Sequence, residues 1–266
     1  MELQLWRAAQ DGEVGRVMEI LGSGGVDVNW RNDSDFGNTA LHMACWNGHD
    51  AIVALLLAHP DIRVNQRTEV GEIPFMAACC GGNTTSIWLL LRDLRVQPNE
   101  CDLEGYSPLW WAAYYGQIDL IKWWIASRRE VILDMGSANS DALAEARNEG
   151  KLEVASLLER FQAAPGDTRR GIRQELGLYD VLAADLFAIA LFWCDDLLRI
   201  TETTRGEDSL MRAKRFLRIT KRLPMELQML LCYRIVGSMR SNIPLFEREA
   251  AFRDLARRLL PNPYEE

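Results

Sequence analysis

The chain has 266 residues, of which 48% are hydrophobic and 26% are charged, and its formal net charge is −8. This apolar content excludes an intrinsically disordered chain, and the length is sufficient for two folded parts. The overall acidity argues against general affinity for nucleic acid. The six cysteines lack the spacing of a disulfide framework, so we expect reduced thiols and an intracellular protein, cytoplasmic or nuclear.

Five glycines follow Ala-rich stretches at a nearly constant interval. They are Gly12, Gly48, Gly82, Gly116 and Gly150, and the last four are spaced 34 residues apart. A period in the low thirties over more than half of the chain predicts a solenoid of stacked two-helix units. Residues 2–30 begin with an amphipathic helix instead of a signal peptide and predict a capping first unit. Residues 142–161 predict a degenerate fifth unit.

The second unit carries the fullest form of the repeat. It reads Thr39-Ala40-Leu41-His42-Met43-Ala44-Cys45-Trp46-Asn47-Gly48-His49 and closes with Asp61-Ile62-Arg63-Val64-Asn65. This resembles the ankyrin repeat, whose T-P-L-H-x-A-A-x-x-G-H and D-V-N patterns it nearly reproduces. The third and fourth units keep the frame but replace His with Met76 and Trp110. The resemblance implies an all-α ankyrin-repeat solenoid over residues 1–165, with helix-turn-helix units, short hairpin loops and a protein partner.

Local chemistry supports the helices of this frame. Pro74 and Pro108 fit the first turn of a helix, where the missing amide hydrogen has no intrahelical acceptor. Thr39 and Ser107 precede a first helix and can cap it. The glycine after the first helix suits a positive φ at the helix C-terminus. The second helix of each unit, such as residues 118–124, must bury its apolar face against neighbouring units.

The resemblance implies recognition by the hairpin tips and by the concave side of the first helices. Aromatic side chains on a rigid scaffold are typical of residues that dominate binding energy. Trp110, Trp111, Trp123 and Trp124 are instead expected in the core or between repeats. A second interpretation is that C-terminal helices fold back over the concave side. The predicted binding residues are Asp35, Phe36, Asn38, Glu69, Val70, Glu72, Leu103, Glu104 and Tyr106 at the tips and Trp46, Asn47, Tyr114 and Tyr115 on the concave side.

The sequence predicts no enzyme, no cofactor and no metal site. His42 and His49 occupy positions that ankyrin repeats fill with His for local hydrogen bonding, so we interpret both as structural. Cys45, Cys79 and Cys80 lie in first helices, where a small thiol packs like Ala. No zinc-ligand spacing, phosphate loop or nucleophile elbow is present.

Residues 166–266 differ from the repeat region in charge. They carry 17 Lys and Arg against 15 Asp and Glu, whereas residues 1–165 carry 13 against 23, a formal net charge of −10. Apolar residues at helical spacing predict an α-helical C-terminal domain with helices near 170–200, 208–223, 224–238 and 245–260. Its apolar run at 182–193 is too short to span a membrane.

One C-terminal helix is predicted to be basic. Five of its cationic side chains share one sector opposite an apolar face, so an acidic partner, nucleic acid or an anionic membrane surface would fit it. The alternatives are a solvated face of a packed helix and an intramolecular match to the acidic repeats. The cationic residues are Arg212, which lies outside the sector, and Lys214, Arg215, Arg218, Lys221 and Arg222.

A short segment of the C-terminal domain resembles an F-box. Leu223-Pro224-Met225-Glu226-Leu227 matches the opening L-P-x-E-L of that module, and residues 228–234 follow it loosely. The resemblance implies an alternative function as a substrate-recognition adaptor that binds a ubiquitin-ligase subunit. Proline at the start of a helix with Glu in the first turn is also ordinary helix chemistry.

Overall fold

The computed structural model describes residues 1–127, 129–134, 136, 141–179, 228 and 232. The chain forms two compact units, residues 1–172 and 173–266. The boundary that the sequence predicts after residue 165 stays a prediction.

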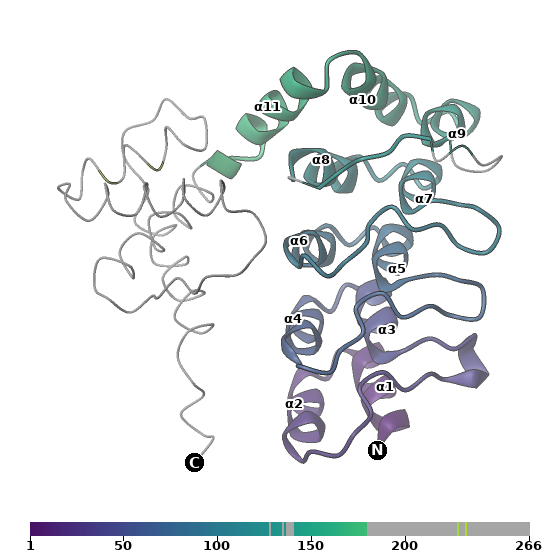
Figure 1. Ribbon diagram of the computed structural model, residues 1–266, viewed down its shortest axis with the longest axis vertical. Helices are drawn as coiled ribbons and strands as arrows, with labels where there is room; N and C mark the ends of the chain where they lie inside the picture. Colours follow the sequence, from purple (N-terminus) through teal and green to yellow (C-terminus); the bar gives the residue numbers. More distant parts are fainter. Residues whose placement is uncertain (128, 135, 137–140, 180–227, 229–231, 233–266) are drawn as a thin grey trace, which may run out of the picture. The chain divides into compact units, whose positions relative to one another are not determined.

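Helices in the first unit follow one another in five pairs (Figure 1). The first helices stack in one column and the second helices in another, and the long loops between pairs project beyond the first column. This arrangement confirms the predicted all-α solenoid. The pairs are α1 (Glu2–Asp11) and α2 (Val14–Gly22), α3 (Ala40–Asn47) and α4 (Asp50–Ala58), α5 (Pro74–Gly81) and α6 (Thr84–Arg92), α7 (Pro108–Tyr114) and α8 (Ile118–Ala126), and α9 (Ala142–Asn148) and α10 (Leu152–Ala163).

The predicted helix ends are confirmed. The Thr39 and Ser107 hydroxyls accept hydrogen bonds from backbone amides in the first turns of α3 and α7, and Pro74 and Pro108 begin α5 and α7. The periodic glycine after each first helix has a φ between 66° and 79°. A residue with a Cβ is strained in this left-handed conformation, so the glycine ends the helix and lets the chain turn into the second one.

The core lies between the two columns of helices and continues from one pair to the next. Large side chains such as Leu41, Ile52 and Phe75 are fully buried. Phe75 of α5 meets Trp124 of α8 edge to face, with 4.9 Å between the ring centroids. Trp124 is therefore a core residue, as predicted, and Trp123 packs against Trp88 of the preceding pair at 4.9 Å.

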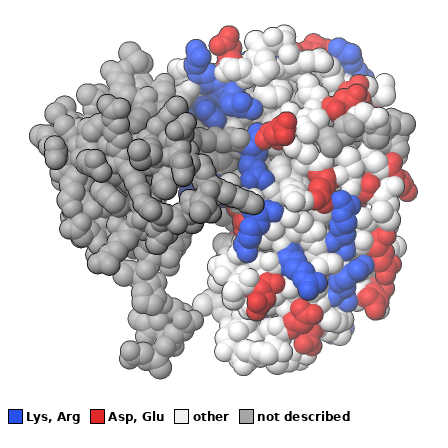
Figure 2. Space-filling view, in the orientation of Figure 1, with Lys and Arg blue, Asp and Glu red and all other residues white. Residues whose placement is uncertain are grey.

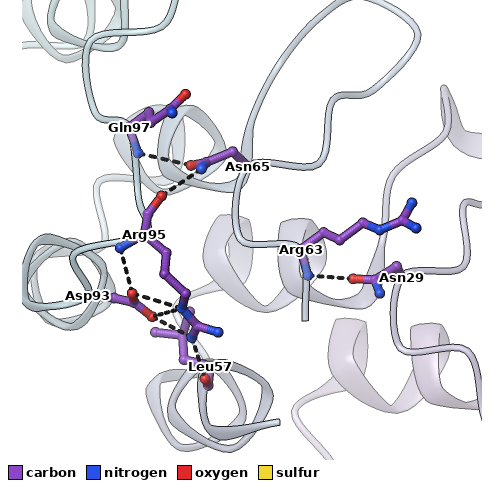
Figure 3. A network of polar contacts seen from close by, with 7 residues as sticks. All are labelled: Asn29, Leu57, Arg63, Asn65, Asp93, Arg95 and Gln97. Atoms are coloured by element: carbon purple, nitrogen blue, oxygen red, sulfur yellow. Dashed lines mark hydrogen bonds and ion pairs between the residues drawn. The ribbon is translucent and has the colours of Figure 1, made fainter. Parts of the chain in front are cut away.

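Asparagine side chains join the loops of consecutive pairs (Figure 3). In each bridge the side-chain amide donates to a loop carbonyl, and the side-chain oxygen accepts from the amide two residues later, at 2.7–2.9 Å. Each asparagine thus satisfies one acceptor and one donor of the next loop's backbone. The bridges run from Asn29 to Asp61 and Arg63, and from Asn65 to Arg95 and Gln97.

The helix after the fifth pair differs from the prediction. α11 spans Pro165–Glu175, and a turn at Leu176 and Gly177 follows it, so the predicted helix over residues 170–200 is wrong at its start and is interrupted. Pro165 suits a helix start, and the φ of 65° at Gly177 is incompatible with a continuing helix. The other three predicted C-terminal helices lie outside the described residues, apart from Gln228 and Cys232.

Candidate partner-binding site

A groove of about 440 Å³ lies between two hairpin tips and the first helices of the second and third pairs. Its walls come from the tip before α3, from α3 itself, from the tip before α5 and from α5. Six of the predicted binding residues line it. The full lining consists of Asp35, Phe36, Asn38, His42, Met43, Trp46, Thr68, Val70, Glu72 and Ala77. We call this the tip groove.

The tip that carries Phe36 is tightly turned. A 3₁₀ helix, η1 (Asp33–Asp35), is capped by the Asn32 side chain, and Asn32 N donates to the Asn38 carbonyl at 3.0 Å. Phe36 follows with a φ of 50°, and it is the one residue other than glycine with a positive φ among those described. A bulky residue in this conformation costs about 1 kcal/mol, yet its side chain is 64% exposed. The backbone therefore presents Phe36 to solvent at the rim of the tip groove.

Backbone hydrogen bonds connect successive tips. Glu69 N donates to the Phe36 carbonyl at 2.8 Å, and Leu103 N donates to the Val70 carbonyl at 3.0 Å. Within its own tip, Gly71 N donates to the Thr68 carbonyl. Main-chain hydrogen bonds thus join the rims of the tip groove to each other.

Trp46 forms the helical wall of the tip groove. Its side chain is 46% exposed, which confirms that the frame points it outward. The Asn83 side-chain amide donates to the Cys45 and Trp46 carbonyls, at 2.9 and 2.7 Å, and so fixes the end of α3. Gly81, the last residue of α5, packs against the same carbonyl, because a Cβ built on it would lie 2.2 Å from Trp46 O.

Two carboxylates line the tip groove. Asp35 accepts a hydrogen bond from the Asn38 side chain at 3.0 Å. Burial, and to a smaller extent the nearby Asp102 carboxylate, raise the pKa of Glu72 above its ordinary value. The Glu72 carboxylate has no hydrogen-bond or ion-pair partner among the residues that the structure describes, although its backbone is fixed by bonds to Thr68 and His42.

A second group of predicted residues forms an aromatic cluster on α7 and the tip before it. The Tyr114 ring stacks on Trp110 at 5.4 Å, and the Tyr115 ring stacks on Trp111 at 6.0 Å. Tyr115 is 45% exposed, whereas Tyr114 is half-buried. The cluster consists of Tyr106, Trp110, Trp111, Tyr114 and Tyr115.

Trp110 and Trp111 do not lie in the core, one of the two places expected for them, and packing between repeats stays a prediction. Both are half-buried, and their rings contact the tyrosines of the aromatic cluster. The Trp111 indole N–H donates to Asp102 Oδ2 at 3.4 Å. The buried positions of α7 are filled instead by Pro108, Leu109, Ala112 and Ala113.

The other predicted binding residues lie outside the tip groove. Leu103, Glu69 and Glu104 are exposed at tips, and Asn47 is exposed with its side chain bonded to the Met43 carbonyl at 3.0 Å. Met43, Thr68 and Ala77 line the groove but were missed. Met43 could have been predicted from the sequence, because it lies three residues before Trp46 and residues at this spacing share a helix face.

The histidines and thiols of the repeats are structural. His42 Nδ1 accepts from Thr39 N at 3.2 Å, and Nε2 lies 3.3 Å from the Glu72 carbonyl, so the ring is neutral and donates from Nε2. His49 Nε2 bonds to the Gln10 carbonyl of the preceding pair at 3.0 Å. These contacts confirm the structural interpretation of both histidines. Burial raises the pKa of the Cys45 and Cys79 thiols, which keeps them protonated.

Basic side chains gather in a column down the repeat array on the face seen in Figure 2. Two arginines of the loops, Arg67 and Arg95, are occupied by contacts between and within repeats. Arg95 donates to the Leu57 carbonyl at 2.7 Å and pairs with Asp93 at 2.6 Å, and Arg67 pairs with Glu100 at 2.7 Å. These contacts favour a role in joining the loops, so we place the candidate site at the tip groove.

Several expectations have no counterpart in the described part of the chain. The basic residues 212–222 and the F-box-like segment 223–227 lie outside it. Within the described residues, no group of three or more His, Cys, Asp or Glu side chains is placed to hold a metal ion. None of the helices described there is long and apolar enough to cross a membrane.

Stacked helix pairs with projecting, backbone-linked tips define a repeat solenoid of the kind that binds other proteins. Residues 5–97 and 59–135 match the family model described as ankyrin repeats (3 copies). Residues 5–135 are therefore ankyrin repeats, which are protein-interaction modules, and the match leaves the F-box-like segment outside it.

Relatives share the repeats over part of the chain. The human SMC5-SMC6 complex localization factor protein 1 is 27% identical over 139 residues, 52% of this chain and 13% of that protein. The Escherichia coli (strain K12) ankyrin repeat protein YahD is 38% identical over 78 residues, 28% of this chain and 39% of that protein. Human Rabankyrin-5 is 30% identical over 107 residues, 40% of this chain and 9% of that protein. The chain thus spans only a minor part of each relative, and none of these names denotes an enzyme.

Proposed function

We propose that this chain is a non-catalytic scaffold or adaptor that binds a partner protein through the tip groove and the aromatic cluster. The observation that carries the proposal is the exposure of Phe36, Trp46 and Tyr115, and hydrogen bonds between repeats hold the carbonyls of Phe36 and Trp46. Large apolar side chains held in place before binding lose little conformational entropy when a partner covers them. The five described cysteines are free, which supports a reducing, intracellular location.

Affinity purification of the full-length protein tests this proposal. The variant Phe36→Ala/Trp46→Ala/Tyr115→Ala removes the three exposed rings, and Met18→Ala removes an apolar side chain of similar exposure from α2, outside the site. We expect the triple variant to lose the proteins that the wild type and Met18→Ala retain, as measured by quantitative mass spectrometry. For a purified partner the affinity should fall at least tenfold, since each ring is of the type that contributes more than about 1 kcal/mol.

Equal recovery of partners by the folded triple variant and the wild type would show that the site lies elsewhere. Far-ultraviolet circular dichroism and the thermal unfolding midpoint establish that the variant is folded. The ubiquitin-ligase adaptor and the basic-helix alternatives stay predictions for residues 166–266, because no described contact bears on them.

A further inference from the structure

The tip groove is lined by acidic and aromatic side chains and by no Lys or Arg. Asp35 and Glu72 supply the carboxylates, and Phe36 and Trp46 supply exposed rings. His42 is neutral in this lining because its ring is buried, which lowers its pKa to about 4. Arg31 packs against Gly37 at the same tip but is not part of the lining.

Glu72 is the group that a ligand would satisfy. Its carbonyl accepts from Thr68 N at 2.9 Å and from His42 Nε2 at 3.3 Å, and its own N–H donates to Thr68 Oγ1 at 3.0 Å. The backbone is therefore fixed while the carboxylate has no described partner. A partly desolvated carboxylate binds a cationic donor more strongly than an exposed one does.

Glu72 also connects the two parts of the candidate site. Burial raises the pKa of Tyr115, and the Glu72 carboxylate adds to this effect, so Glu72 lies within electrostatic reach of the aromatic cluster. A cationic group beside Glu72 would lie in the groove that the Trp46 ring also lines, from α3. Aromatic faces and carboxylates together favour guanidinium and ammonium groups.

We propose that the tip groove binds a basic peptide segment of a partner protein and places an arginine or lysine side chain between the Trp46 ring and the Glu72 carboxylate. This inference rests on the proposed function and adds the chemistry of the partner. The charge of the repeat region agrees with it, because residues 1–165 carry a formal net charge of −10 that attracts a basic segment.

Peptide binding to the full-length protein tests the inference. The probes are nine-residue peptides of random sequence on an array, each made with Arg, citrulline, Lys or norleucine at its centre. Affinities of the peptides that bind are then measured by fluorescence polarisation. We expect the Arg and Lys peptides to bind at least tenfold more tightly than their citrulline and norleucine counterparts, as hydrogen bonds to charged groups exceed neutral ones.

Matched variants identify the acid that makes this discrimination. Glu72→Gln should abolish the preference for Arg over citrulline while binding the citrulline peptide as the wild type does. Glu69→Gln removes the same charge from an exposed position on the same tip, outside the lining, and should keep the preference. Equal loss in both variants would show a general effect of charge and would overturn the inference.

Other outcomes separate this inference from the proposed function. Suppose that peptides bind whether or not their central residue is charged, and that Trp46→Ala no longer binds them. This result would overturn the basic-ligand inference but support the tip groove as a binding site. Peptides that bind Trp46→Ala normally would count against both. If basic peptides bind at least tenfold more tightly after Lys214, Arg215 and Arg218 are changed to Gln, the occupant is this chain's own basic segment, and the partner assignment is wrong.

Discussion

His42 is a titratable residue that burial turns into a structural one. Its ring spans from the Thr39 backbone to the Glu72 carbonyl of the next repeat and is 1% exposed. Desolvation lowers its pKa from 6.5 to about 4, since the charged form would lose its hydration. The residue therefore contributes to stability only while it is neutral.

Stability should depend on pH through this residue. Between about pH 6.5 and pH 4 the unfolded chain binds a proton at His42 that the folded chain does not. The stabilising contribution of neutral His42 is complete above pH 6.5 and is lost as the pH falls toward 4. At pH 5 this loss makes the free energy of unfolding about 2 kcal/mol lower than at pH 7. Urea unfolding at pH 7 and pH 5 measures this difference, which should be smaller in His42→Gln. An identical pH dependence in both proteins would contradict it.

Gly81 is required by a close approach and not by its φ. A Cβ at this position would lie 2.2 Å from the Trp46 carbonyl oxygen, a backbone atom. We expect Gly81→Ala to lower the free energy of unfolding by about 1–3 kcal/mol, because the two repeats must move apart. Gly22 also ends a helix, but a Cβ there meets nothing within 4 Å. Gly22→Ala should be neutral or stabilising in the same denaturation experiment.

At the scale of elements, the loops are joined more closely than their sequence indicates. The repeat pattern includes the D-V-N motif that ends at Asn65, but the pattern does not say what this asparagine binds. In the structure Asn65 joins two successive loops by donating to the Arg95 carbonyl and accepting from Gln97 N. The partners lie about one repeat away, so only a stacked neighbour reveals them.

Asn65 therefore offers a test of these bridges. Asn65→Ala should lower the free energy of unfolding by about 1–2 kcal/mol, since two hydrogen bonds between loops are lost and water replaces them only in part. Asn99→Ala is the matched change, because Asn99 makes one longer bond, 3.2 Å to the Glu130 carbonyl. We expect its effect to be about half as large in chemical denaturation. Equal effects would show that the bridges do not determine the difference.

At the scale of the whole chain, the glycine period predicted the repeat architecture because local chemistry repeats with it. Caps at Thr39 and Ser107 and the left-handed glycines need no distant contact, and all were correct. The tip groove was predictable only in part, because its hollow depends on how side chain sizes differ between repeats. Met43, Ala77 and Trp111 occupy equivalent positions, and the small Ala77 leaves space beside Met43. The repeat pattern predicts which way each side chain points, but it does not predict how much space remains between neighbouring side chains.

Main-chain hydrogen bonds between tips limit which substitutions and insertions this surface can accept. The Phe36 and Val70 carbonyls accept hydrogen bonds from the amides of Glu69 and Leu103, so these bonds between tips do not use the side chains of the four residues. Substitutions at these positions can alter ligand preference while the geometry is kept, whereas an inserted or deleted tip residue would disrupt the adjoining tip. The side chains of this surface can therefore vary more readily than the length of its loops.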